Sequence, residues 1–298
     1  MTATAVLPDT SLASSLLRTA RPRQWIKNLL VVAVPGASGA LFTTGALRGV
    51  LLAFVAFTLA AVGTYFINDA ADVEADRRHP VKRHRPIAAG ELGVSDARWI
   101  GYGSAIAALG LAVAVSWSFA ACVAAYLALT AAYSARLKHV PVLDVLIVAG
   151  GFLLRAVGGG AATATSTSNW FLLVILLGSL YLVIAKRIGE LNRTAQGAPG
   201  RRVLAGYSAP WLQQISSMTL SGTVLAYAAW AFPYLGGDVA LPLLAASLVP
   251  FLAALMRYSL LVAHGAGEAP ERVLTSDIFL IGSGLLWVAM AGGALYLA

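Results

Sequence analysis

Long apolar stretches separated by short polar segments recur along the whole chain. Each stretch approaches the ~20 residues that a helix needs to cross a bilayer, and charged residues are rare within it. We predict nine membrane-spanning helices, with ends good to about 4 residues, at 29–46, 50–67, 99–116, 118–135, 142–160, 169–185, 215–234, 240–256 and 278–297. The pattern therefore predicts an all-α integral membrane protein that folds as one nine-helix bundle.

The composition agrees with this pattern. Hydrophobic residues make up 59% of the 298 residues, charged residues make up 11%, and the mean hydropathy is +0.78. These values exclude an ordinary soluble domain. The single cysteine, Cys122, lies inside a predicted span, which argues against disulfides and cysteine metal clusters.

The first 28 residues have no long apolar core and do not look like a cleaved signal peptide. We expect them to form a basic N-terminal arm, followed by a single membrane domain over residues 29–298. With nine spans, this arm and the loops after spans 2, 4, 6 and 8 hold nearly every lysine and arginine, whereas the opposite side has Arg48 and Asp238. The positive-inside rule then places the N-terminus and the polar loops in the cytoplasm. We therefore predict a multi-pass plasma-membrane protein. A nucleic-acid partner is not expected, because no soluble binding module is evident.

The most informative polar segment follows the second predicted span. On a helix, Asn68, Asp72 and Asp76 are spaced four apart and Asp69 lies three before Asp72, so we expect their oxygens on one face. Carboxylate and amide oxygens suit Mg²⁺, which readily shares its shell with substrate phosphates. Charged groups at membrane depth are usually functional, and a solvated loop is the alternative. Three cations that would face phosphate charge follow the acids: Lys82, Arg83 and Arg85.

Other polar residues lie around predicted spans 4 and 5. Arg136 or Lys138 could reach an anion held by the first motif, and Asp144 could hold a cation or fix one of these bases. The alternative for Tyr133 and the two bases is an aromatic belt residue followed by snorkelling cations. Arg155, inside span 5, should face a cavity or an acid; a structural role and lipid-phosphate binding both remain open. Glycines around it would let neighbouring helices approach closely.

A second polar cluster closes the sixth predicted span. Lys186 and Glu190 are one helical turn apart, and Arg187 lies beside them. Bases and an acid can thus line one edge of the helix. We predict a second half-site here, and a stop-transfer group of cations is the alternative.

With these segments in place, the chain resembles the UbiA superfamily of intramembrane prenyltransferases over nearly its full length. The resemblance rests on Asn68-Asp69-x-x-Asp72-x-x-x-Asp76, on His79-Pro80-x-Lys82-x-x-Arg85-Pro86-Ile87, and on Tyr133 with Lys138. It implies a nine-helix bundle around a cavity open sideways to lipid. Two polar motifs would bind Mg²⁺ and diphosphate beneath a cytoplasmic cap.

The second cluster departs from the usual family pattern. Typical members carry a second aspartate-rich motif there, whereas this chain reads Lys186-Arg187-Ile188-Gly189-Glu190. A more basic half-site suits a second anionic substrate. Together with the opening Arg21-Pro22-Arg23-Gln24-Trp25-Ile26-Lys27-Asn28, the pattern resembles the decaprenyl-phosphate phosphoribosyltransferase branch. That branch implies transfer of 5-phosphoribosyl from 5-phosphoribosyl diphosphate (PRPP) to decaprenyl phosphate, with release of diphosphate, for cell-wall arabinan synthesis.

On this reading, Asn68, Asp69, Asp72 and Asp76 hold Mg²⁺, and the three aspartates together with Glu190 form the catalytic set. Glu190 would bind metal or a ribose hydroxyl. We assign Lys82, Arg85 and Lys138 to the donor phosphates, Lys186 and Arg187 to the second half-site, and Lys27 or Arg23 to either phosphate. The full set of substrate-binding candidates is Lys27, Asn68, Lys82, Arg85, Tyr133, Arg136, Lys138, Arg155, Lys186 and Arg187. The expected partners are PRPP, a polyprenyl phosphate and membrane lipids. The oligomeric state is open, with a homo-oligomer as one alternative.

Two rival functions stay open. The first is a conventional family member that moves a prenyl group from a prenyl diphosphate to an aromatic acceptor. The second is a membrane transporter that uses Arg155 and the loop acids. The second is less favoured, because discontinuous half-helices and paired midplane charges are not evident.

Overall fold

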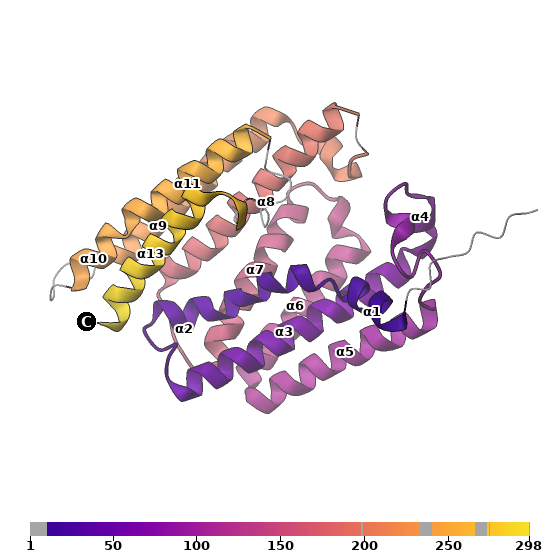
Figure 1. Cartoon of the computed structure of the whole chain (residues 1–298), viewed down its shortest axis with the longest axis horizontal. Helices are drawn as coiled ribbons and strands as arrows, with labels where there is room; N and C mark the ends of the chain where they lie inside the picture. The colour runs from indigo at the N-terminus through magenta and orange to yellow at the C-terminus, as the bar shows by residue number, and fades with distance from the viewer. Residues whose placement is uncertain (1–10, 198, 233–239, 266–272, 274, 298) are drawn as a thin grey trace, which may run out of the picture.

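The computed structural model describes residues 11–197, 199–232, 240–265, 273 and 275–297 (Figure 1). These residues form helices and connecting segments, without a β-strand. The helices are α1 (Leu12–Ala20), η1 (Pro22–Val32), α2 (Ala33–Ala37), α3 (Thr44–Ala71), α4 (Val73–Arg78), η2 (Lys82–His84), α5 (Val94–Val115), α6 (Trp117–Ala135), η3 (Leu137–His139), α7 (Leu143–Ala162), α8 (Asn169–Ala195), η4 (Arg202–Gly206), α9 (Ala209–Ala231), α10 (Ala240–Ala246), α11 (Leu248–Ala263) and α13 (Ile278–Tyr296). The η elements are 3₁₀ helices.

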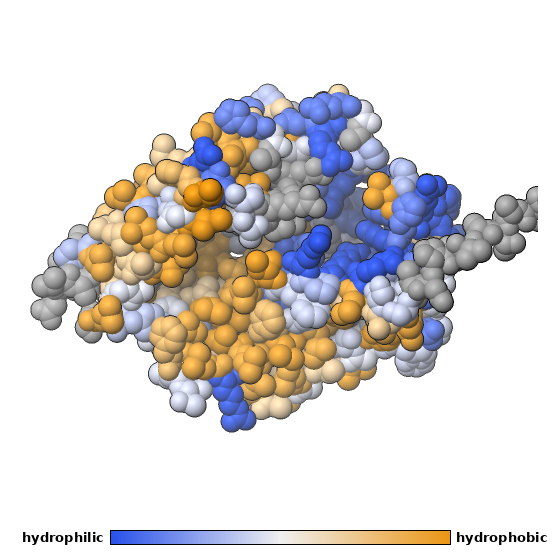
Figure 2. Space-filling view, in the orientation of Figure 1, coloured by the Kyte–Doolittle hydropathy of each residue, from blue (hydrophilic) through white to orange (hydrophobic). Residues whose placement is uncertain are grey.

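The helices form two groups joined in the middle. One group contains α3, α5 and α6, with α3 packed along α5, and the other contains α9, α10, α11 and α13. Between them, α7 packs on α6 and α8, and α8 packs on α9 (Figure 1). Figure 2 shows hydrophilic side chains gathered over α1, α4 and the end of α8, while the opposite part of this face is largely hydrophobic. The polar chemistry thus lies at one end of an otherwise apolar bundle.

Seven helices in the described part of the chain are long and apolar enough to cross a membrane. They are α3, α5, α6, α7, α8, residues Pro242–Ala263 and α13. The all-α, multi-pass architecture is therefore confirmed. Capping side chains fix where several of these helices begin: Thr43 accepts a hydrogen bond from the Ala46 amide, and Ser116 accepts one from the Phe119 amide, which satisfies amides left unpaired at helix starts.

The predicted first span, at 29–46, is wrong as a single helix. The chain forms the 3₁₀ helix η1, then the short α2, and α3 starts at Thr44. Pro22 stands in the first turn of η1, Pro35 lies within α2, and Gly39 has a φ of 73° in the turn that follows. Proline removes a backbone donor and a positive φ ends a right-handed helix. This apolar segment therefore does not form one continuous helix.

The predicted span at 215–234 corresponds to α9, which is not among those seven helices. Serine, threonine and glutamine side chains interrupt its apolar sequence, including Gln213, Ser217 and Thr219. Thr219 is buried and its hydroxyl donates to the Ile215 carbonyl at 2.8 Å. Some polar side chains of α9 are therefore buried inside the protein, and hydropathy alone does not reveal this.

The described part of the N-terminal arm packs against the bundle. Ser15, buried on α1, donates to Glu91 at 2.6 Å, and Arg18 pairs with the same carboxylate at 3.1 Å. Beyond α1, Arg21 takes a left-handed conformation with a φ of 53°, and η1 then enters the bundle. The boundary between arm and membrane domain at residue 28 stays a prediction.

Glycine makes the contact between η1 and α7 possible. A Cβ atom added at Gly159 would lie 2.0 Å from the Val31 carbonyl oxygen, well inside van der Waals contact. The prediction that glycines in this span allow close approach is thereby confirmed. Because η1 rests on α7 at this point, the contact also fixes where the side chains of η1 lie.

Candidate active site

The first acidic motif straddles the break between α3 and α4. Asp69 lies in the last turns of α3, Asp72 separates the two helices, and Asp76 lies in α4. Asp69 and Asp76 are 3% and 2% exposed. Arg85 joins them, because its Nη1 lies 2.9 Å from Asp69 Oδ1 and 2.7 Å from Asp76 Oδ2. The structure therefore brings these two carboxylates around one cationic atom.

Asp72 does not join that pair. Its carboxylate is half-exposed and lies 3.5 Å from the Lys138 ammonium, which comes from η3. The expectation that all four oxygen-bearing residues share one helical face is wrong in this respect, because the helix breaks at Asp72. Asn68 is partly buried near the end of α3, and Arg136 is exposed at the end of α6. Lys82 lies at the edge of the motif, 3.9 Å from Asp76.

Arg21 belongs to this site, although we did not assign it a site role from the sequence. Its Nη2 contacts both oxygens of Asp69, at 2.6 and 2.8 Å, and its guanidinium lies 4.7 Å from the centre of the Tyr65 ring. The one sequence feature that could have indicated Arg21 is the run of cations before the first predicted span. Nothing in that run distinguishes Arg21 from Arg23, since the partner lies 48 residues away.

The second half-site is an alternating chain of acids and bases. Buried Arg187 donates through Nε to Asp144 at 2.8 Å and through Nη1 to Glu190 at 2.7 Å. The other oxygen of Glu190 lies 3.5 Å from Arg201, whose Nη1 lies 3.4 Å from the Tyr133 hydroxyl. Both acids are thus engaged by arginine. Burying such charges costs desolvation free energy, which is offset here because each charge has an opposite partner and is hydrogen-bonded.

Tyr207, just after η4, holds the Asp144 end of this row of acids and bases. We did not predict it from the sequence. Its hydroxyl donates to Asp144 and accepts from the Val142 amide at 2.7 Å. Val142 has a φ of 69°, which is strained for a β-branched residue. Burial, followed by the hydrogen bond to Asp144, raises the pKa of Tyr207 above its ordinary value. The hydroxyl therefore stays protonated and remains a donor to the carboxylate.

A cavity of about 520 Å³ lies between the two groups of helices, with η1 and α8 among its walls. Most of its wall is apolar, and includes Leu30, Phe152, Val174, Ile175, Leu182 and Leu255. Its polar lining residues include Lys27, Tyr133, Lys186, Arg187 and Arg201. Four predicted site residues, Lys27, Tyr133, Lys186 and Arg187, therefore share one cavity. Such a shape suits an apolar molecule with an anionic end.

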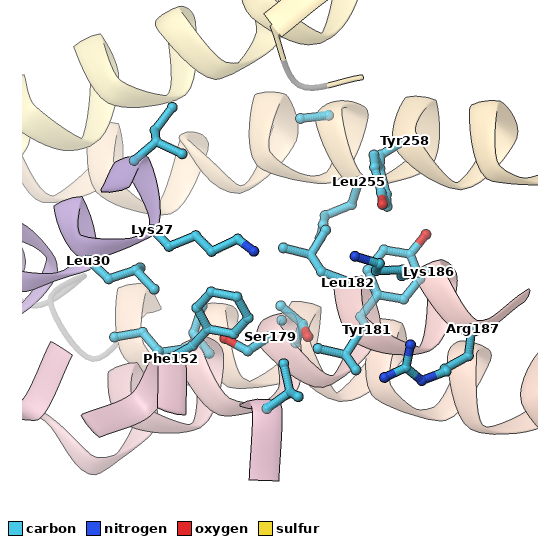
Figure 3. A pocket seen from close by; sticks show the side chains of 18 of the residues that line it. Lys27, Leu30, Phe152, Ser179, Tyr181, Leu182, Lys186, Arg187, Leu255 and Tyr258 are labelled. Atoms are coloured by element: carbon cyan, nitrogen blue, oxygen red, sulfur yellow. The ribbon is translucent and has the colours of Figure 1, made fainter. Parts of the chain in front are cut away.

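Two ammonium groups face each other across this cavity. Figure 3 shows Lys27, from η1, and Lys186, from α8, pointing into it from opposite sides. In the described part of the chain, no hydrogen bond or ion pair involves the Lys186 ammonium. A lysine among apolar walls is costly without an anion. Lys186 is thus placed to receive a negatively charged ligand.

The sequence model of the UbiA prenyltransferase family matches residues 29–284. The chain belongs to this family. The resemblance stated from the motifs is thereby confirmed.

Several relatives that match nearly the whole chain carry the same name. A decaprenyl-phosphate phosphoribosyltransferase from Corynebacterium glutamicum is 40% identical over 300 residues, covering 97% of this chain and 89% of the relative. One with the same name from Mycobacterium tuberculosis is 37% identical, covering 96% of each chain. The branch that the second polar cluster indicated is therefore confirmed by similarity over nearly the whole chain.

Solved structures share the UbiA fold at low identity. A UbiA homolog from Archaeoglobus fulgidus bound to DMAPP and Mg²⁺ has a TM-score of 0.72 at 20% identity, covering 95% of this chain and 99% of that chain. The apo structure of a UbiA homolog from Aeropyrum pernix has a TM-score of 0.61 at 13% identity, covering 94% of this chain and 98% of that one. These similarities establish the fold.

The donors around the UbiA-type first motif fit a hard cation. Asp69 and Asp76 each direct one oxygen at the same Arg85 nitrogen, so a small cation could bridge them. Mg²⁺ commonly takes one or two carboxylates and completes its shell with water and substrate phosphate. In the described residues, no group of three or more acidic, histidine or cysteine side chains converges as a metal cage. The arrangement therefore fits an ion shared with a substrate.

Arg155 lies apart from both half-sites. It is 6% exposed and donates to Asn28 at 2.7 Å, to the Gly151 carbonyl at 2.8 Å and to the Tyr126 hydroxyl at 2.9 Å. It also lies 4.5 Å from the centre of the Tyr126 ring. We expected it to face a cavity or an acid. Its partners among the described residues are neutral, and it is not one of the lining residues of the cavity between the helix groups. The contacts tie η1, α6 and α7 together.

Proposed function

We propose that this protein transfers the 5-phosphoribosyl group of PRPP to a polyprenyl phosphate such as decaprenyl phosphate, with release of diphosphate. The relatives of this name and the family membership support the reaction class. The observation that carries the proposal is the cavity. It combines a mostly apolar wall with cations, among them Lys27 and Lys186, and shares Tyr133 with the polar segment that leads to Lys138.

The two half-sites would take one substrate each. Tyr133 and Lys138 lie five residues apart on α6 and η3; Tyr133 contacts Arg201 of the second half-site, and Lys138 contacts Asp72 of the first. This segment links the two. The donor diphosphate would lie at the first motif, near Lys82, Arg85 and Lys138. The acceptor phosphate would lie in the cavity, near Lys27, Lys186 and Arg187.

The chemistry needs little from a base. The bond from ribose C1 to the diphosphate oxygen breaks, and a phosphate oxygen of the lipid forms the new bond at C1. That oxygen is already anionic, so no strong general base is required. The cations must hold two negatively charged substrates together and stabilise the charge that develops on the leaving diphosphate. Mg²⁺, held by Asp69 and Asp76 with Asn68 and Asp72 nearby, would supply further neutralisation of that leaving group.

Several finer features belong to the same proposal. We propose a nine-helix membrane domain whose polar cavity and loops face the cytoplasm, in the plasma membrane. Glu190 is engaged by arginines, so we propose that it orients Arg187 and meets a ribose hydroxyl. The product would serve cell-wall arabinan synthesis, and a homo-oligomer is compatible with this arrangement.

The first experiment incubates purified protein with Mg²⁺, polyprenyl phosphate and ribose-labelled PRPP, and follows label into the organic phase. Label in a lipid that still carries phosphate between sugar and chain, lost when a chelator is added, supports the proposal. No labelled lipid, together with transfer from a prenyl diphosphate to an aromatic acceptor, would establish the conventional family reaction instead. Label that crosses sealed vesicles without a covalent product would favour a transporter.

Single substitutions separate the two half-sites. Asp72→Ala and Asp76→Ala should abolish turnover, since they remove carboxylates from the motif assigned to the metal and donor. Lys186→Ala should mainly weaken lipid binding, raising KM for the acceptor about tenfold, the loss expected for one charge-assisted contact. Steady-state kinetics with each substrate varied in turn measures both effects. Full activity of Asp72→Ala would contradict the metal-site assignment.

A further inference from the structure

Every aspartate of the first motif already has a cationic partner from the chain. Asp69 is engaged by Arg21 and Arg85, Asp76 by Arg85 and more distantly by Lys82, and Asp72 by Lys138. The contacts of Asp69 and Asp76 with the arginines are short, between 2.6 and 2.9 Å. A metal ion that binds Asp69 would therefore compete with guanidinium contacts at both carboxylate oxygens, and one that binds Asp76 Oδ2 would compete with Arg85.

The two sides of these ion pairs differ in their freedom to move. The side chains of Asp69 and Asp76 are each 4% exposed, whereas those of Arg21 and Arg85 are 32% and 30% exposed. The carboxylates are held within the bundle, and a buried carboxylate needs a compensating cation at all times. The arginines reach them from the solvent side on long side chains. An exchange of partners would thus move the arginines and leave the acids in place.

Guanidinium groups and diphosphate are well matched. Arginine presents a planar fork of donors that binds phosphate oxygens as readily as carboxylate oxygens. If a divalent cation took the carboxylates alone, two guanidiniums would be left next to it with no anion. If diphosphate approached alone, it would meet the two carboxylates. When both arrive together, each charge regains an opposite partner.

We propose that Arg21 and Arg85 compete with Mg²⁺ for Asp69 and Asp76, and pass to the donor diphosphate when the metal binds. Arg21 is thereby assigned as a further substrate-binding residue, supplied by the joint between α1 and η1. The consequence is that metal and diphosphate bind cooperatively, and each raises the affinity of the other by the same factor. The inference rests on the proposed function for the identity of the diphosphate ligand.

The test measures metal binding without turnover. Mn²⁺ serves as the probe for the Mg²⁺ site, and free Mn²⁺ is quantified by electron paramagnetic resonance during titration of the purified full-length protein, with and without inorganic diphosphate. For the unchanged protein, diphosphate should raise the Mn²⁺ affinity at least about tenfold, within the usual range of coupling between sites. No enhancement of Mn²⁺ binding by diphosphate would overturn the proposal.

Substitutions locate the coupling. Arg21→Gln should bind Mn²⁺ alone several-fold more tightly, because a competing cation is gone, while the enhancement by diphosphate should shrink. Arg21→Lys keeps the charge without the fork and should give intermediate values. Arg77→Gln is the matched control: it removes a cation from the same region that pairs with Glu74, so it should change neither value. Mn²⁺ binding to Arg21→Gln that is unchanged or weaker than in the unchanged protein would refute the competition, provided size-exclusion chromatography shows the same monodisperse protein.

The outcome is separable from the fate of the proposed function. Cooperative Mn²⁺ and diphosphate binding without any labelled lipid would uphold the arginine exchange and reject the phosphoribosyl transfer. Labelled lipid without such cooperativity would do the reverse.

Discussion

Asp144 shows how one buried charge organises a site from distant parts of the chain. Its carboxylate is fully buried and is held by Arg187, 43 residues away, and by Tyr207, 63 residues away. Tyr207 links the segment after α8 to the start of α7, where Val142 takes its strained conformation. A single hydroxyl thus supports both a backbone turn and a carboxylate.

Replacing Tyr207 by phenylalanine should lower stability in a pH-dependent way. Burial and the hydrogen bond to Asp144 raise the pKa of Tyr207, so above about pH 10, the ordinary tyrosine pKa, the unfolded chain loses this proton while the folded protein keeps it. The stability that Tyr207 contributes is therefore present below that pH and declines as pH rises. The difference in unfolding midpoint between the unchanged protein and Tyr207→Phe should be largest near neutral pH and should shrink above about pH 10.

Thermal unfolding in detergent from neutral to alkaline pH measures this difference. Tyr102→Phe is the control, because Tyr102 is 52% exposed and should leave the midpoint unchanged. A gap for Tyr207→Phe that is the same at every pH would show that the proton of Tyr207 is not involved.

At this scale the sequence identified residue types better than partners. The charged residues of both half-sites stand out because charge is rare in apolar spans. Partner choice does not follow from spacing: Arg21 reaches Asp69 across 48 residues, and Arg155 takes an amide and a phenol in place of an acid. Such contacts depend on how the helices pack, which a one-dimensional pattern does not contain.

Among the elements, η1 has the most direct bearing on the cavity. It is an 11-residue 3₁₀ helix, longer than the three or four residues at which most such helices stop. It carries Lys27 into the cavity and buried Asn28 to Arg155. Its close contact with Gly159 of α7 holds it at the depth where Lys27 can meet a ligand.

Gly159→Ala should therefore displace η1. The added methyl group would lie 2.0 Å from the Val31 carbonyl oxygen, and overpacking of this kind typically costs about 1–3 kcal/mol. We expect a lower unfolding midpoint and reduced lipid labelling. Gly103→Ala is the matched control on α5, since nothing lies within 4 Å of its added Cβ; there alanine should be neutral or stabilising by up to ~1 kcal/mol. Equal midpoints for the two variants would contradict this account of the η1–α7 contact.

Hydropathy predicted continuous apolar helices well and interrupted ones poorly. The span at 50–67 lies within α3 and that at 118–135 lies within α6, because nothing in these stretches breaks a helix. The failure at 29–46 has the opposite cause, since proline and glycine divide a stretch whose composition is still apolar.

For the molecule as a whole, the charge distribution predicts orientation. Lysine and arginine gather at the polar end, which the positive-inside rule assigns to the cytoplasm. In a Cys122→Ala background, Arg83→Cys places a thiol in η2, and Thr44→Cys places one at the start of α3, both at exposed positions. A membrane-impermeant maleimide should label Arg83→Cys in inverted vesicles and Thr44→Cys in intact cells.

The reverse labelling pattern would contradict the orientation. The starting protein without cysteine is the control for background labelling. Orientation is predicted from summed charge, and the family resemblance implies a cavity. The residues that line the cavity do not follow from the sequence pattern, because they come from distant elements, among them η1, α6, α7, α8 and α11.

The size of the cavity limits how much of a lipid chain the protein can contact. About 520 Å³ accommodates a ligand of ordinary drug size, which is far less than a long polyprenyl chain. If the proposed acceptor is right, the first few isoprene units and the phosphate lie within the protein, and the remainder lies among the acyl chains of the bilayer. Binding would then not depend on chain length beyond those first units. Short, easily handled polyprenyl phosphates should therefore serve as acceptors nearly as well as long ones.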